Sequence, residues 1–141
     1  MAQGYATNLA SEFLVLSTLY RLGFDASLTL GNKKAVDIAV ILDEGRAVTI
    51  DVKANAGKND WLLGDGEVHS GPNHFFVLVS FENRFHAVEE VPRCWVFPAD
   101  HLLQFVKTAG NGKTRYLSRR AILNEGGKYE GAWELLRTGS Q

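Results

Sequence analysis

The chain has 141 residues, of which 45% are hydrophobic and 22% are charged, and its net charge is −1. This size and composition are typical of a globular protein, and we expect one domain over residues 1–141. The near-neutral charge argues against a dedicated nucleic-acid coat protein, because neutralising phosphates requires a basic surface, but it does not exclude an enzyme with a local basic site.

The first predicted element is a helix over residues 5–22, followed by Gly23 as a left-handed stop. Apolar side chains recur along it at helical spacing, which predicts one buried stripe. The residues of this stripe are Tyr5, Leu9, Phe13, Leu16 and Tyr20. Residues 24–30 are expected to run extended.

Residues 35–42 and 46–54 alternate apolar and polar side chains, which predicts two strands of a hairpin. The link Asp43-Glu44-Gly45 suits a three-residue loop with Gly45 at positive φ. Such a loop pairs Leu42 with Arg46. A two-residue loop would instead shift the register by one residue.

The three-residue register has a chemical consequence. It places Asp37 opposite Asp51 and Lys53 opposite Ala35, with both aspartates and the lysine on one face. Directly opposed carboxylates lie about 5 Å apart and repel each other. A divalent cation between them would reverse the sign of this interaction, and Mg²⁺ favours such carboxylates.

The remaining elements follow from shorter patterns. Residues 55–73 are rich in Gly, Asn and Asp and are expected to form a long loop, and residues 74–81 form an apolar run typical of a central strand. A strand over 93–97, a short helix over 99–107 and a closing helix over 129–136 with Trp133 as core anchor complete the prediction. This order of elements predicts an α/β layered domain with a mixed central sheet.

Glu12 lies on the first predicted helix, between Leu16 and Leu19 on a helical wheel. A carboxylate on the flank of an apolar stripe is costly to bury without a cation or hydrogen-bond donors. Glu12 therefore either reaches water at the edge of the stripe or takes part in a buried site.

The segment Ala35-Val36-Asp37-Ile38-Ala39-Val40-Ile41, followed by Thr49-Ile50-Asp51-Val52-Lys53-Ala54, resembles the signature of the PD-(D/E)xK nuclease superfamily. Val36 stands where the signature has proline. The preceding helix with Glu12 is similar to the first helix of the small Holliday-junction-resolvase-like members. The later strands and Trp133 resemble the intron-endonuclease-like branch.

The resemblance implies restriction-endonuclease-like α/β/α layers around the sheet and hydrolysis of DNA phosphodiester bonds. It assigns Asp37, Asp51 and Glu12 as ligands of Mg²⁺, with Mn²⁺ as a substitute. Lys53 would orient the attacking water or stabilise charge on the phosphate. These four residues are the expected catalytic set.

Basic residues supply the expected DNA contacts. Residues 107–120 contain five Lys or Arg and no acidic residue, which fits either a solvated face or a phosphate-binding patch. The residues assigned to nucleic acid are Lys58, Arg115, Arg119 and Arg120. Trp61 either stacks on a base or anchors its loop.

His69 and His74 flank a short turn, and either could contact a scissile phosphate. A zinc site would need two further ligands, for which Cys94 is a poor candidate. Cys94, the only cysteine, excludes an intrachain disulfide and is expected to be a buried small side chain.

Three functions remain open from the sequence. The first is a metal-dependent DNA endonuclease, for which a homodimer is plausible because cutting both strands usually needs two sites. The second is a non-catalytic binding protein on the same fold, and the third is an unrelated hydrolase or a structural subunit. With no signal peptide or membrane helix in the sequence, we expect a cytoplasmic protein without a membrane partner.

Overall fold

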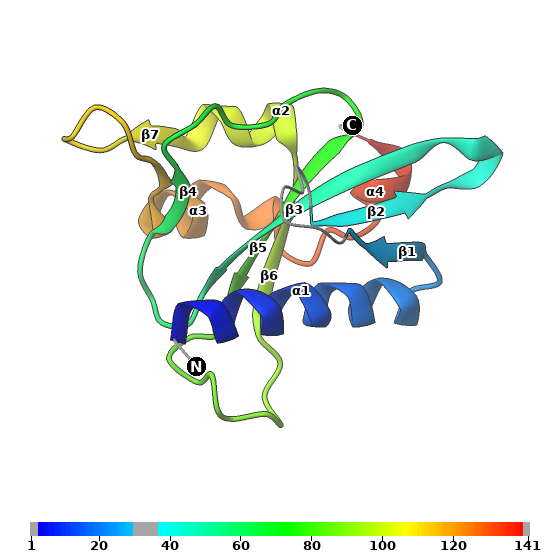
Figure 1. Ribbon diagram of the computed structural model, residues 1–141, viewed down its shortest axis with the longest axis horizontal. Helices are drawn as coiled ribbons and strands as arrows, with labels where there is room; N and C mark the ends of the chain where they lie inside the picture. The colour runs from blue at the N-terminus through cyan, green and yellow to red at the C-terminus, as the bar shows by residue number, and fades with distance from the viewer. Residues whose placement is uncertain (1–2, 30–36, 140–141) are drawn as a thin grey trace.

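The computed structural model describes residues 3–29 and 37–139. Its α-helices are α1 (Gln3–Arg21), α2 (Ala99–Leu102), α3 (Arg119–Glu125) and α4 (Leu135–Thr138) (Figure 1). Its strands are β1 (Asp25–Leu28), β2 (Ile38–Ile41), β3 (Ala47–Asn55), β4 (Trp61–Gly64), β5 (His74–Ser80), β6 (Arg93–Pro98), β7 (Val106–Thr108) and β8 (Arg115–Leu117). Within these ranges no helix is both long and apolar enough to cross a bilayer.

A five-stranded sheet in the order β1-β2-β3-β5-β6 forms the centre of the fold. β3 and β5 run parallel, whereas the other neighbouring pairs are antiparallel. Every residue of β5 is buried, as the continuous apolar run predicts for a central strand. The expected α/β class with a mixed central sheet is therefore confirmed.

Each face of this sheet carries its own hydrophobic core. α1 and α4 cover one face, where Val15, Leu19 and Leu136 pack against the valines and isoleucines of the strands. The other face is covered by α2, α3 and a small sheet in the order β4-β8-β7. The sheet thus lies between two covering layers, with α1 running along the lower side in Figure 1.

The hairpin of β2 and β3 has the predicted register. Ile41 pairs with Ala47, and the N–H of Leu42 donates to the carbonyl of Arg46 at 2.6 Å. The connecting residues Asp43–Gly45 form a single 3₁₀ turn, η1, and Gly45 has the predicted positive φ of 76°. The three-residue loop therefore fixes which residues of β2 and β3 lie opposite each other. Ala35 and Val36 lie outside the described residues.

The buried face of α1 differs from the predicted stripe. The helix buries Thr7, Ser11, Val15 and Leu19, whereas the predicted stripe is largely open to solvent. Two of the buried residues are polar, but their hydroxyls donate to backbone carbonyls within the helix. Because these hydroxyls are satisfied locally, the helix can bury them and leave an apolar face outside.

The predicted long loop over residues 55–73 contains β4. This strand pairs with β8, and Trp61 at its start is buried. The indole Nε1–H of Trp61 donates to the carbonyl of Val79 at 3.1 Å, and its ring packs edge-on against Trp95 at 5.5 Å. Trp61 is thus a core anchor and not a base-stacking residue.

The two late helices were predicted too long. The predicted helix over 99–107 divides into α2, the 3₁₀ turn η2 (Leu103–Phe105) and β7, because β7 pairs with β8. The predicted helix over 129–136 divides into the 3₁₀ turn η3 (Gly127–Tyr129), an irregular segment and α4. Trp133 is only half-buried against the core, and Tyr129 and Leu136 are the buried anchors.

We expect Trp61→Ala to lower the free energy of unfolding by about 3–5 kcal/mol, because it leaves a cavity and removes the hydrogen bond to Val79. Urea denaturation followed by circular dichroism measures this change. The neighbouring Leu62 is exposed, so Leu62→Ala should change stability by less than about 0.5 kcal/mol. Equal effects of the two substitutions would contradict the anchoring role of β4.

Candidate metal centre

The alternation of β3 separates its side chains into two sets. Val48, Ile50 and Val52 face α1, so Asp51 and Lys53 point to the opposite face of the sheet. Asp51 is buried and Lys53 is half-buried. A carboxylate and an amine two residues apart therefore lie on one face, as the sequence predicted.

The parallel pairing of β3 with β5 brings a histidine to Asp51. Thr49 is the register partner of His74, the first residue of β5. His74 contacts the Thr49 hydroxyl through Nδ1 at 2.7 Å and Asp51 Oδ2 through Nε2 at 3.2 Å. The threonine thereby fixes the orientation of the imidazole ring.

His69 approaches the same carboxylate oxygen from the segment between β4 and β5. Its Nδ1 lies 2.8 Å from Asp51 Oδ2, and its ring packs edge-on against His74. The side chain of His69 is 48% exposed, compared with 7% for His74 and 11% for Asp51. The cluster is thus anchored in the sheet and open to solvent on the His69 side.

The electrostatics of the cluster favour the ionised carboxylate. Burial raises the pKa of Asp51, but the hydrogen bonds and positive charge of His74 and His69 outweigh burial, and the net effect is a lowered pKa. Asp51 is therefore a carboxylate at neutral pH and is available as a metal ligand or as a hydrogen-bond acceptor.

The donor atoms of Asp51, His69 and His74 fit a divalent cation. One ligand atom from each lies within 4.8 Å of the other two, and this is the group of potential metal ligands found in the described part of the chain. The Nδ1 contact of His74 with Thr49 is the kind of outer hydrogen bond that orients a ligating imidazole. Two imidazole nitrogens and one carboxylate oxygen suit Mn²⁺, Fe²⁺ or Zn²⁺ better than Mg²⁺, which prefers oxygen.

Asp37 lies next to β2, at the position opposite Asp51 in the predicted register. The N–H of Asp37 donates to the carbonyl of Ile50 at 3.0 Å, one residue short of Asp51, so the regular ladder of β2 and β3 ends at the Ile38–Ile50 pair. The carboxylate Oδ2 of Asp37 accepts the N–H of Val52 at 2.7 Å. Asp37 therefore directly precedes β2, and its carboxylate is bonded to β3 one residue beyond Asp51, outside the group formed with the histidines.

Glu12 belongs to α1 and is half-buried. Because α1 packs on the Val48, Ile50 and Val52 face of the sheet, it lies on the opposite side from Asp51. The metal group above does not include Glu12. Its assignment as a metal ligand stays a prediction.

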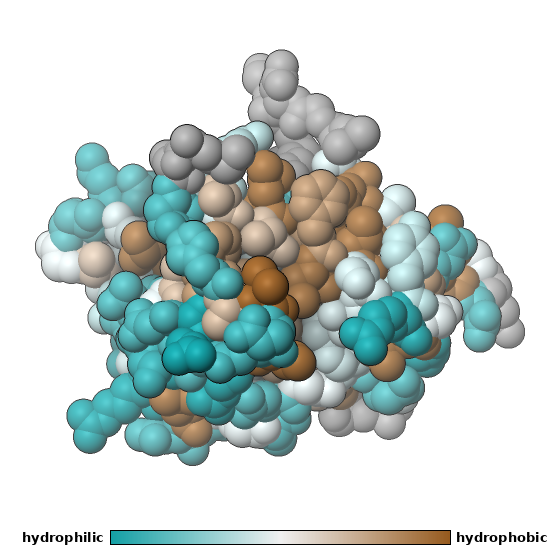
Figure 2. Space-filling model, turned by 90° about the horizontal axis from the view of Figure 1, so that it is seen from below, coloured by the Kyte–Doolittle hydropathy of each residue, from teal (hydrophilic) through white to brown (hydrophobic). Residues whose placement is uncertain are grey.

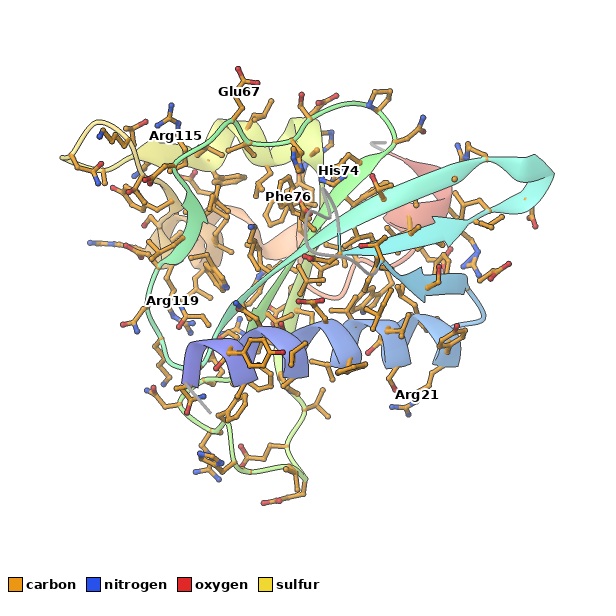
Figure 3. All side chains as sticks on the ribbon, viewed as in Figure 1. Arg21, Glu67, His74, Phe76, Arg115 and Arg119 are labelled. Atoms are coloured by element: carbon orange, nitrogen blue, oxygen red, sulfur yellow. The ribbon has the colours of Figure 1, made fainter. Side chains whose placement is uncertain are left out.

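The predicted DNA-contacting residues lie in different environments. Lys58 and Arg120 are exposed, whereas Arg115 is half-buried and donates to the carbonyl of Lys113. Arg119 is largely buried and ion-paired with Glu82 at 2.8 Å, and it also donates to the Ser80 hydroxyl. In Figure 3, Arg115 and Arg119 lie at the small-sheet end of the molecule, away from His74.

The sequence offered both histidines only as phosphate contacts or as half of a zinc site. The sequence did not predict that His74 lies beside Asp51, because parallel strands such as β3 and β5 are joined by a long crossover and their pairing is not a local property. The signal that was available is position: His74 opens a buried strand, and Asp51 lies in the preceding long strand. These two positions indicate a common site only when β3 and β5 are known to pair.

Comparisons with known proteins bear on the fold. No protein-family model and no curated protein matches the chain. Among solved structures, the chain is similar to a bacterial homing endonuclease, I-Ssp6803I, with a TM-score of 0.62 and 17% identity over 95% of this chain and 92% of that chain. At this identity the likeness shows a shared mixed α/β fold.

The Arg119–Glu82 pair leads to a prediction about acid stability. Burial raises the pKa of Glu82. Its hydrogen bonds with Ser80 and Arg119 and the charges of Arg119 and Arg93 lower the pKa by more than burial raises it, so the net pKa is below the ordinary 4.5. The ionised carboxylate therefore stabilises the fold above that pH, and the contribution is lost as pH falls through the lowered pKa.

We expect Glu82→Gln to reduce the free energy of unfolding at about pH 7, and the difference from the wild type to shrink at about pH 3. Urea denaturation at the two pH values measures both quantities. Glu89→Gln, at an exposed residue of the same connection, serves as the control. A difference that stays constant with pH would show that the Glu82 ion pair does not contribute to stability.

Proposed function

We propose that this protein is a divalent-metal-dependent endonuclease that hydrolyses phosphodiester bonds in DNA. The observation that carries the proposal is the gathering of Asp51, His69 and His74 into one cluster with Lys53 two residues from Asp51. This cluster lies on the central sheet of a fold similar to that of a homing endonuclease. A carboxylate, imidazoles and an amine on one sheet face are suited to binding and activating a phosphodiester.

The cation would be held by Asp51, His74 and His69. When bound, it supplies Lewis-acid stabilisation of the phosphate oxygens and lowers the pKa of water. Mn²⁺ is compatible both with this mixed nitrogen and oxygen set and with the carboxylate set expected from the sequence, so we propose it as the first cation to test. Asp37 would support the centre from the end of β2.

The side chains of the cluster have separate tasks in the proposed hydrolysis. Lys53 stabilises negative charge on the phosphate, since it shares the face of Asp51 and is accessible. His69 would complete the cation site beside Asp51 and His74, and its solvent-exposed side leaves the cluster open to water. Attack of water on phosphorus forms one P–O bond and breaks the P–O bond to the sugar oxygen. The attacking water gives a proton to solvent, and the leaving sugar oxygen takes one from solvent. We assign Glu12 a supporting role only, because α1 covers the other face.

DNA would approach over the exposed end of the cluster. Lys58 is exposed in the loop three residues after β3, beyond the end of the strand opposite to Thr49 and His74, and Arg120 on α3 is also exposed. These two residues, with Arg115, are proposed to contact the phosphate backbone, which positions the duplex without reading its sequence. Arg119 is proposed to stabilise the fold and not to contact DNA, because its guanidinium already binds Glu82 and Ser80.

A non-catalytic binding protein on the same fold is the second candidate. The specific observation in its favour is that Arg119, one of the expected DNA contacts, is engaged inside the protein, in a chain whose net charge is −1. This alternative predicts a folded protein that neither cleaves DNA nor needs a cation.

Metal binding is the first test. We expect titration calorimetry with Mn²⁺ to give one site, and His74→Ala to weaken it by about 10–100-fold, because both the ligand and its link to Thr49 are lost. His86→Ala, at an exposed histidine outside the cluster, should leave binding unchanged. Equal affinity in the His74 and His86 variants would remove the histidines from the metal site.

Cleavage is the second test. We expect nicking of supercoiled plasmid in Mn²⁺ to fall by at least about 100-fold in Asp51→Asn and in Lys53→Met, since each removes a group that acts on the reacting phosphate. Asp25→Asn, at an exposed carboxylate on β1, is the matched control.

The same assay distinguishes the two candidate functions. Absence of cleavage by the wild type on plasmid, single-stranded DNA and a four-way junction, in both Mn²⁺ and Mg²⁺, would favour the non-catalytic alternative. Cleavage that persists in Asp51→Asn would place the reaction at another site.

A further inference from the structure

The outer face of α1 carries an apolar line that the fold does not cover. Tyr5, Phe13 and Tyr20 are 59%, 55% and 57% exposed. Leu9 and Leu16 lie between them along the helix and are half-buried, and Leu16 also packs against the core under α1. We call these five residues the α1 stripe. It is the set that the sequence predicted as the buried face.

The stripe points away from the core. Thr7, Ser11, Val15 and Leu19 face the sheet, and at about 100° per residue the stripe lies on nearly the opposite side of the helix. Figure 2, which views the molecule from the α1 side, shows a hydrophobic patch near the middle of this face. A contiguous exposed apolar patch of this kind marks an interaction surface.

The order of residues in the stripe reads the same in both directions. From the middle of the helix, Leu9 and Leu16 are equally distant, as are Tyr5 and Tyr20 farther out, and Phe13 lies at the centre. Two copies of α1 packed antiparallel would therefore set tyrosine against tyrosine and leucine against leucine. Self-complementarity about a centre is the requirement of a twofold interface.

Charge and area also fit a second copy. The charged residues of α1 are Glu12, which borders the stripe next to Leu16, and Arg21, which lies beyond its end. With more than half of each ring exposed, the three aromatic side chains offer roughly 100 Å² each. Two copies then bury about 600 Å² from these rings alone, and the leucines and the flanks of the helix bring the total toward the roughly 1,000 Å² of a small specific interface.

We propose that the protein forms a homodimer through antiparallel packing of its two α1 helices, with Phe13 next to the twofold axis. The face of the sheet that carries Asp51 and Lys53 lies opposite α1, so such a dimer would not cover it. The proposal rests on the exposure and symmetry of the stripe and is independent of the proposed nuclease activity.

Sedimentation velocity of the full chain over micromolar to sub-millimolar concentrations tests the association. We expect a dimer in the wild type and a rise of at least about 10-fold in the dimer dissociation constant in Phe13→Glu, because a charge is placed at the dry centre. Leu62→Glu, at an exposed apolar residue of β4 on the other face of the sheet, should still dimerise. Thermal unfolding verifies that both variants are folded.

The relative orientation of the helices has its own test. Single cysteines at Tyr5, Phe13 or Tyr20 are treated with a short bis-maleimide, matched to the about 8–10 Å between the axes of packed helices. The native Cys94 reacts slowly because burial raises the pKa of its thiol to about 12, and treated wild type measures its contribution.

Antiparallel packing predicts cross-linking of Phe13→Cys with itself, and of Tyr5→Cys only when it is mixed with Tyr20→Cys. Two Tyr5 positions would lie about 22 Å apart along the helices and should not react. Cross-linking of Tyr5→Cys with itself would indicate parallel helices and overturn the proposal. A monomeric wild type at every concentration would also overturn it and would leave the stripe to a different protein partner.

Discussion

The parallel pairing of β3 with β5 is the constraint on which the candidate centre depends. It aligns Thr49 with His74, and this alignment carries the histidine ring to the buried carboxylate of Asp51. It also places β5 inside the sheet, between β3 and β6, so the pairing that builds the core builds the site as well. A shift of one residue between the two strands would turn His74 to the α1 face and separate the three groups.

The sequence predicted the local geometry of the hairpin well. The three-residue connection ending in Gly45 determines the register of β2 and β3 from Ile41–Ala47 to Ile38–Ile50. The predicted opposition of Asp37 and Asp51 does not continue that register, because the N–H of Asp37 bonds to Ile50. Turn chemistry and alternation are local properties, so they can be read from neighbouring residues. The α/β class and the position of β5 inside the sheet were predicted on the same basis.

Other features depended on contacts between distant residues and were missed. Both faces of α1 carry enough apolar or locally satisfied side chains to be buried, and the sheet selects the one with Val15 and Leu19. Likewise Trp61 lies in a segment rich in glycine and asparagine, but this segment forms strand β4 because it pairs with β8. Propensity cannot predict either outcome, because packing against a remote partner decides both.

The three residues of the cluster come from the sheet and from one connecting segment, so ligand binding at the cluster would depend on the conformation of that segment. Asp51 and His74 are held rigidly by the sheet, whereas His69 comes from the half-exposed connection between β4 and β5. Any ligand that binds all three groups must therefore restrict the motion of that connection. By reciprocity, an interaction that restricts the connection would raise the affinity of the centre for its ligand. Ligand binding and ordering of the connection would therefore be thermodynamically coupled.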